Sequence, residues 1–293
     1  MAKGSDNWPI TWADDGNLYT AYGDGYGFEP KVPEKLSLGY AKILGVPPNI
    51  RGINIRSQTG ERKGEGSSGP KASGLLMVDN RLYMLVRNTG NSQLAWSEDH
   101  ARSWSWAEWR FKKSFGCPTF LNFGRNYENA RDQFVYICSP DSDNAYSYAD
   151  SMIMARVPKD RILNKNAYEF FSGMDPKGSP RFSFRIEDRK PVFRNKGKCR
   201  RSGISYHPGF RRYLWVQTFG PRDCRFEGGI AVYDAPEPWG PWTTVYYSPK
   251  WDIGPGESAS FPTKWFLFDK RTAYLVFSGN DSFSVRRAEL FSW

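Results

Sequence analysis

The sequence predicts an all-β fold, a five-bladed β-propeller with four-stranded antiparallel blades. Two observations predict it. Helical periodicity is almost absent from the 293 residues, and a hairpin pattern recurs five times, each time followed by a less regular strand pair. Short apolar or alternating runs joined by polar or glycine turns are typical of β-hairpins. Four-strand units repeated at roughly 40 to 80 residues are typical of propellers. A β-sandwich, or a pair of them, is the alternative.

The strand pairs can be placed along the chain. The predicted first hairpins pair 8–12 with 18–22, 74–78 with 81–86, 119–123 with 133–137, 203–206 with 212–218, and 264–268 with 272–277. The predicted outer pairs are 93–96 with 104–109, 151–156 with 168–171, and 229–233 with 242–246. The last unit ends near Arg286 without a fourth strand, which the other terminus or residues 291–293 could supply. The Gly/Ser/Lys-rich stretch 56–73 is predicted to be a loop between blades, so we expect a single domain, 1–293.

A turn motif at residues 97–104 supports the propeller independently. Ser97, Asp99 and Trp104 have the spacing of the Asp-box of sialidase-like propellers, Ser-x-Asp-x-Gly-x-Thr-Trp, with Ala101 in the glycine position and Ser103 for Thr. In such a motif the carboxylate ties down turn amides and the Trp fills the gap between blades. It indicates a fold and not an activity.

Composition excludes several classes. Aromatic residues make up 16%, and 41 Lys and Arg stand against 31 Asp and Glu, a net charge of +10. The chain is too aromatic for disorder, it lacks the ~18 consecutive apolar residues of a membrane span, and no signal peptide is visible. We therefore expect a soluble protein. The charge suits an anionic polysaccharide or nucleic acid, or is only a solvated surface. Because no nucleic-acid-binding motif is present, we expect no nucleic-acid partner.

Strand direction sorts the polar residues between two faces. In an antiparallel blade, the start of the inner strand and the end of the second strand share one face, and we expect the ligand site there. His100 and His207 both fall in turns of the opposite face. The expected ligand site therefore has no histidine with which to form a catalytic triad or bind zinc. The pair Asp14 and Asp15 is interpreted as a hairpin turn signal with Gly16.

Two other carboxylates, Asp6 and Asp24, are the predicted catalytic residues. They flank the first hairpin at equal distances from its turn, so they should be neighbours across the ladder. Like charges held close raise one pKa, as a glycosidase needs. Strand-end caps or a structural calcium site are the alternatives, and no other cofactor is expected. The predicted substrate-binding residues on the same rim are Trp8, Tyr22, Arg87, Asp150, Arg201, Arg222, Glu257 and Asp281.

The four cysteines occupy corresponding positions in the third and fourth predicted hairpins. Cys117 and Cys138 could meet across one hairpin, and Cys199 and Cys224 across the next. Two disulfides would favour a secreted or periplasmic protein. Four free thiols in a cytoplasmic protein are the alternative, and no pair has metal-type spacing.

Several stretches together resemble a bacterial family long catalogued as a domain of unknown function. They are DNWPITWADDGNLYTAYGDG at 6–25, ISYHPGFRRYL at 204–214, APEPWGPW at 235–242, and FPTKW with FSG at 261–265 and 277–279. The family is similar to five-bladed sialidase-like and arabinanase-like propellers, and some members are endo-D-arabinanases. The resemblance implies a carbohydrate-active enzyme with acidic residues at the propeller centre, and Asp6 and Asp24 match the first motif. The basic charge departs from what neutral arabinan requires.

We therefore expect a monomeric glycoside hydrolase that cleaves a polysaccharide, arabinan-like or anionic. The first alternative is a polysaccharide lyase on a uronate-containing glycan, which would use Arg201 with Tyr148 or Tyr206 as base. The second is a non-catalytic glycan-binding propeller.

Overall fold

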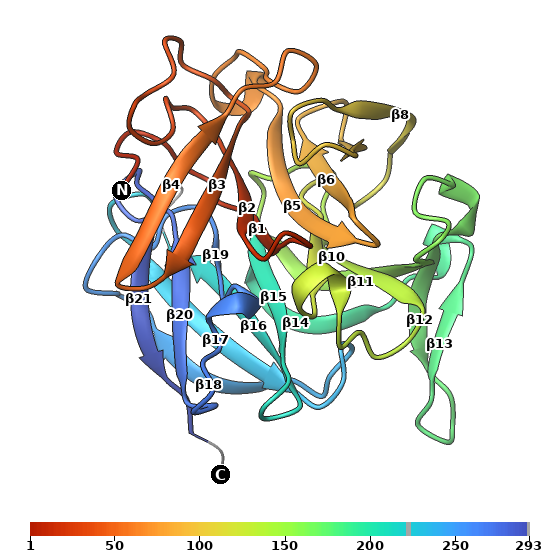
Figure 1. The fold of residues 1–293 in the computed structure, drawn as a ribbon. Coiled ribbons are helices and arrows are strands. Elements are labelled where there is room, and N and C mark those ends of the chain that lie inside the picture. The colour runs from red at the N-terminus through yellow and green to blue at the C-terminus, as the bar shows by residue number, and fades with distance from the viewer. Residues whose placement is uncertain (221–223, 292–293) are drawn as a thin grey trace.

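The computed structural model describes residues 1–220 and 224–291, and in this part of the chain it is all-β (Figure 1). Consecutive antiparallel groups of strands follow one another. The first contains β1 (Ile10–Trp12), β2 (Leu18–Tyr22), β3 (Gly39–Val46) and β4 (Asn49–Ile55). The second contains β5 (Lys71–Val78), β6 (Arg81–Arg87), β7 (Ser92–Ser97) and β8 (Ser105–Phe111). Each group is one sheet in sequence order, as the predicted hairpin series requires.

The middle of the chain forms one larger sheet. Its strands are β9 (Thr119–Asn122), β10 (Phe134–Pro140), β11 (Ala149–Pro158), β12 (Glu169–Met174), β13 (Pro180–Ser183), β14 (Pro191–Cys199), β15 (Ser202–His207), β16 (Arg212–Phe219), β17 (Gly229–Ala235) and β18 (Thr243–Ser248). A short parallel contact between β9 and β15 joins its two halves. The hairpin of β12 and β13 projects to the right in Figure 1.

The last group contains β19 (Ala259–Ser260), β20 (Thr272–Phe277) and β21 (Ser284–Glu289). Backbone hydrogen bonds join Met1 to Phe283, and the N-terminus lies beside β21 in Figure 1. The helices of the described part are single 3-10 turns: η1 (Gly66–Ser68), η2 (Arg125–Tyr127), η3 (Lys165–Ala167), η4 (Ile186–Asp188) and η5 (Thr263–Trp265).

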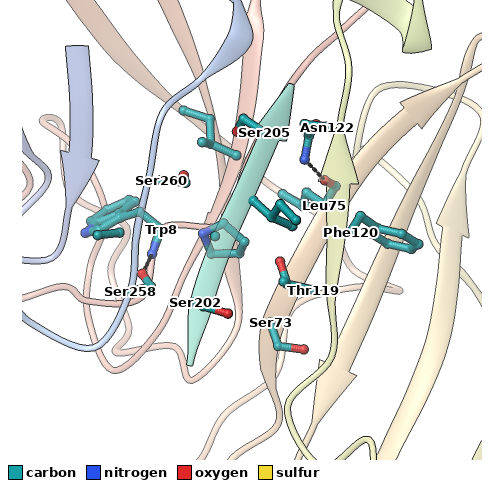
Figure 2. Close-up of a pocket in the computed structure, with 15 residues that line it drawn as sticks. Trp8, Ser73, Leu75, Thr119, Phe120, Asn122, Ser202, Ser205, Ser258 and Ser260 are labelled. Atoms are coloured by element: carbon teal, nitrogen blue, oxygen red, sulfur yellow. Dashed lines mark hydrogen bonds between the residues drawn. The ribbon is translucent and has the colours of Figure 1, made fainter. Parts of the chain in front are cut away.

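The first strands of the groups surround a narrow central cavity of about 30 Å³. Residues of β5, β9 and β15 line it together with Trp8 and the serines of β19 and its approach (Figure 2). Four of the five predicted first hairpins are confirmed in position. The fifth prediction is wrong in its first strand, because β20 pairs with Ala259–Ser260 while 263–265 form η5.

The Asp-box does what its sequence predicts. The Asp99 carboxylate accepts hydrogen bonds from the Ser103 amide and the Ser97 hydroxyl, both at 2.8 Å. Trp104 is buried and stacks on Tyr40 of β3, with ring centroids 5.0 Å apart. The motif therefore fastens the second strand group to the first.

The predicted disulfides are not present among the described residues. Strand register explains the first case, because Cys138 of β10 lies opposite Thr119 and not opposite Cys117. In the second case, the thiol of Cys199 donates to the carbonyl oxygen of Asn195. The cysteines are free thiols and therefore give no support to export from the cell.

Candidate functional site

Polar residues at the starts of the inner strands meet at one mouth of the central cavity. Asp6 precedes β1, Lys71 begins β5, Arg201 precedes β15 and Glu257 precedes β19. Neighbouring strand ends add Asp24, after β2, and Arg87, the last residue of β6. We call these six residues the central cluster. Ion pairs join Lys71 to Asp24, Arg201 to Glu257 and, at 3.5 Å, Arg87 to Glu257.

Asp6 is the most perturbed carboxyl group of the cluster. It is 6% exposed, and its Oδ1 atom has no hydrogen-bond partner. Burial, reinforced by the negative charge of Glu257, raises the pKa of Asp6 to about 7. A carboxyl group with such a pKa carries its proton for much of the time near neutral pH, so it can act as a general acid.

Gly23 makes room for Asp6. The two residues form an antiparallel bridge, with amide-to-carbonyl distances of 3.0 and 2.8 Å. A Cβ atom on Gly23 would lie only 2.8 Å from Asp6 Oδ1. The register therefore places Asp6 opposite Gly23, one residue from the predicted partner Asp24.

Asp24 is committed to other groups. One of its oxygens accepts from the Lys71 ammonium group, and the other accepts from the Gly66 amide at 3.0 Å. Lys71 is 2% exposed, and burial lowers the pKa of its ammonium group. Asp24 therefore holds the Lys71 charge beside Asp6, and its own negative charge also favours the protonated form of Asp6.

Glu257 is in the opposite electrostatic state to Asp6. Burial alone would raise its pKa, but the guanidinium groups of Arg201 and Arg87 hold the pKa of Glu257 below its usual value. The cluster thus contains one carboxyl group that is readily protonated and one that stays ionised.

The two arginines have hydrogen-bonding capacity to spare. Arg87 is fully buried and Arg201 is 3% exposed, yet Nε and Nη2 of Arg87 and Nη2 of Arg201 have no hydrogen-bond partner among the described residues, although Arg87 Nη2 lies 3.5 Å from Glu257. Both guanidinium groups also lie against the ring of Tyr146, whose hydroxyl accepts from Arg87 at 3.3 Å. Buried donors without partners are costly, so this corner of the cluster is suited to an oxygen-rich or anionic ligand.

The central cavity continues beneath the cluster. Thr119 lines it together with Trp8, Ser73, Ser202 and Ser258, each of which follows a residue of the central cluster by one or two positions (Figure 2). The buried Trp8 Nε1 and the Ser202 hydroxyl oxygen have no hydrogen-bond partner among the described residues. A polar cavity of this size can hold about one or two water molecules.

The structure sorts the predicted site residues. It brings together Asp6, Asp24, Arg87, Arg201 and Glu257, as strand direction predicts. Trp8 and Tyr22, also predicted to bind substrate, are each 1% exposed and pack with Phe28 in the core.

The side chains of two further predicted residues have other partners. Asp150 accepts from the Gly197 amide, and Asp281 pairs with Arg225. Arg222 lies outside the described residues. His100 lies in a turn at the opposite end, with Nε2 2.8 Å from Asp14, whereas His207, predicted in a turn, is the last residue of β15 and stacks on Phe210.

Sequence reasoning missed Lys71 and Tyr146. Lys71 was missed because the predicted strand began at Gly74, although β5 starts three residues earlier. The signal that could have found it is position, because Lys71 opens an inner strand at the same end as Asp6, Arg201 and Glu257. Tyr146 lies in the loop between β10 and β11 and carries no such signal.

Among the described residues no group of three or more His, Cys, Asp or Glu side chains is placed to hold a metal ion. No helix in the same residues is long and apolar enough to span a membrane.

Comparison with known proteins gives the fold. No protein-family model matches the chain, and no curated protein matches its sequence. Solved structures do. A GH43_1 enzyme from Xanthomonas citri, complexed with xylose, superposes with a TM-score of 0.53 at 13% identity, covering 99% of this chain and 87% of that one. A GH43 β-xylosidase/α-arabinofuranosidase from a compost microbial metagenome gives 0.51 at 13%, covering 99% and 92%. At these identities the likeness shows the propeller fold of such enzymes and nothing finer.

Proposed function

We propose that this chain is a glycoside hydrolase on a single five-bladed propeller domain, related to the sialidase-like family that includes endo-D-arabinanases. The observation that carries the proposal is the contrast between Asp6 and Glu257 in one buried cluster at the mouth of the central cavity. A glycosidase needs one carboxyl group to protonate the leaving oxygen and another, ionised, to activate water or attack the sugar.

In this proposal Asp6 is the proton donor and Glu257 is the ionised partner. Asp24 is a positioning residue, because both of its oxygens are already engaged by Lys71 and the Gly66 amide. Arg87 and Arg201 set the charge of Glu257 and have spare donors for substrate oxygens. The structural neighbours support a glycan substrate, since the Xanthomonas citri enzyme is solved in complex with xylose and with xylotriose.

The substrate is proposed to be a polysaccharide, and the cluster favours an anionic one. With Asp6 protonated, the cations of Lys71, Arg87 and Arg201 outnumber the ionised Asp24 and Glu257. We place its action outside the cell, where such polymers are encountered, and propose that the protein works as a monomer without a nucleic-acid partner or cofactor.

A second candidate, a lyase, is favoured by the unpartnered donors of Arg87 and Arg201 beside the Tyr146 hydroxyl. A lyase neutralises a uronate carboxylate with cations and removes the neighbouring proton with a base such as tyrosine. It leaves an unsaturated product that absorbs near 235 nm, whereas a hydrolase does not.

The test is digestion of a polysaccharide panel that contains arabinan, xylan, polygalacturonate and alginate. We expect the wild type to release reducing ends from at least one polymer, and Asp6→Asn and Glu257→Gln each to lower the rate at least ~100-fold. Both variants should keep a cooperative melting transition. Unchanged rates would remove the assignment of these residues, a 235 nm product would favour the lyase, and binding without product would favour the glycan-binding alternative.

A further inference from the structure

The positive charge of the chain is concentrated in one segment. Residues 156–201 contain fourteen of the 41 Lys and Arg and five of the 31 Asp and Glu, so this segment carries nine of the ten net positive charges. Its C-terminal part, β14, leads directly through Arg200 into Arg201 of the central cluster.

Near its end β14 bulges out of the sheet. Ser151 of β11 lies opposite Arg194, but Ala149 lies opposite Cys199, so β14 has three residues more than its partner between these pairs. Gly197 adopts φ +66°, which favours glycine, and its amide donates to Asp150 at 2.8 Å. β-bulges re-aim side chains and are frequent beside active sites.

The bulge presents cations to solvent. The side chains of Arg194, Lys196 and Lys198 are exposed. None of them forms an ion pair with a carboxylate of the described residues, although the Asp150 carboxylate accepts from Gly197 within the bulge. On the other face of β14, Phe193 packs on Trp215 and Tyr233 and anchors the strand. We call Arg194, Lys196 and Lys198 the basic bulge.

An exposed aromatic ring lies beside the basic bulge. Tyr247 of β18 is 43% exposed, and its hydroxyl lies 3.2 Å from Lys198 Nζ. Its ring stacks on Phe219, with centroids 5.1 Å apart and planes 15° from parallel. A fixed aromatic face next to a cation can stack on a sugar ring and pair with an acidic group on the same sugar.

We propose that the basic bulge and Tyr247 form a distal binding site for an anionic polysaccharide, a chain bearing carboxylate or sulfate groups, that extends from the central cluster. The inference rests on the proposed function, since the chain would be the substrate of that cluster. Arg201 is three positions after Lys198, so their Cα atoms are at most about 11 Å apart. One chain of several sugars can therefore contact both regions.

The test is binding, measured by calorimetry with the Asp6→Asn protein so that nothing is cut. The ligands are polygalacturonate, chondroitin sulfate and neutral arabinan, each as a long polymer and as a short oligosaccharide. The variant is Lys196→Gln/Lys198→Gln, and the matched control is Lys165→Gln/Lys177→Gln, which removes the same charge from exposed lysines elsewhere.

We expect the bulge variant to raise the Kd of a long anionic polymer about three- to tenfold, with no change for the control variant or for neutral arabinan. Near 1 M salt the difference should vanish, because the Debye length falls to about 3 Å. Tyr247→Ala should weaken binding of the same polymers. Whether sulfate adds to binding follows from chondroitin sulfate, which bears both carboxylate and sulfate, against polygalacturonate, which bears carboxylate alone.

Equal effects in bulge and control variants, or no effect in either, would overturn the inference. A third result would also overturn it: single-stranded DNA of the same length that binds as tightly as the anionic polysaccharide and loses affinity by the same factor in the bulge variant. Digestion by the wild type decides the proposed function separately. If the wild type digests a polymer but the bulge variant binds it normally, only the distal site is overturned. If the bulge variant binds more weakly but the wild type digests no polymer, only the hydrolase is overturned.

Discussion

Carboxyl groups at the two ends of the strand groups are in opposite states. At the far end, the Asp269 carboxylate accepts hydrogen bonds from the Arg271 and Thr272 amides and the Thr272 hydroxyl. Those bonds from Thr272 hold the pKa of Asp269 below its usual value. At the near end, Asp6 has an unpartnered oxygen and a pKa raised to about 7. Satisfied carboxylates stabilise turns, and unsatisfied buried ones are available for chemistry.

The largest effect that separates the two ends is expected from Gly23→Ala. The added methyl group would lie 2.8 Å from Asp6 Oδ1 and must displace that carboxyl group. Because a displacement of about 1 Å at a catalytic group can cost ~100-fold, we expect turnover on the best substrate of the panel to fall by that order. Steady-state kinetics measure it.

The matched control at the far end is Asp269→Ala, which removes a turn-capping carboxylate. It should lower the free energy of unfolding slightly and leave turnover unchanged. If Asp269→Ala reduces turnover as much as Gly23→Ala, the two ends do not differ in the way described here.

A smaller effect is expected from pH, and it has a definite sign. Asp6 must be protonated to act as the acid, so turnover should decline above pH about 7, approaching tenfold per pH unit. The free energy of unfolding should also depend on the protonation of Asp6. A carboxyl group whose pKa is raised on folding favours the native state when protonated, so its contribution is lost as pH rises from about 4 to about 7.

Asp6→Asn cannot ionise and should lack that loss. Urea unfolding at pH 5 and pH 8 should therefore show a decrease in the wild type, relative to the variant, on the order of a few kcal/mol. Parallel pH dependences of wild type and variant would mean that Asp6 is ionised throughout this range.

The fold and half of the site follow from sequence because local signals and topology agree there. Asp-Gly turns and alternating runs place most hairpins, and strand direction then brings Arg87, Arg201 and Glu257 to the mouth with Asp6. The misplaced strand at 264–268 has a stronger apolar pattern than the two-residue β19, which nothing local distinguishes. Trp8 and Tyr22 could not be assigned, since an aromatic residue at a strand end serves a core and a sugar platform equally well.

The smallest expected effect is that of a reductant on Tm, which we expect to be zero. Register places Cys138 opposite Thr119, and burial raises the pKa of the Cys138 thiol well above its usual value. A native disulfide contributes about 2–5 kcal/mol, which would appear as a fall of several degrees in Tm on reduction. We expect Tm to be the same with and without dithiothreitol, and Cys117, Cys138 and Cys199 to be alkylated after unfolding without prior reduction. A lower Tm in reductant, with protection of Cys117 and Cys138 from alkylation, would mean that β10 is shifted along β9 so that these two cysteines face each other. That shift would also move the loop that carries Tyr146, and with it the arginine corner of the near end.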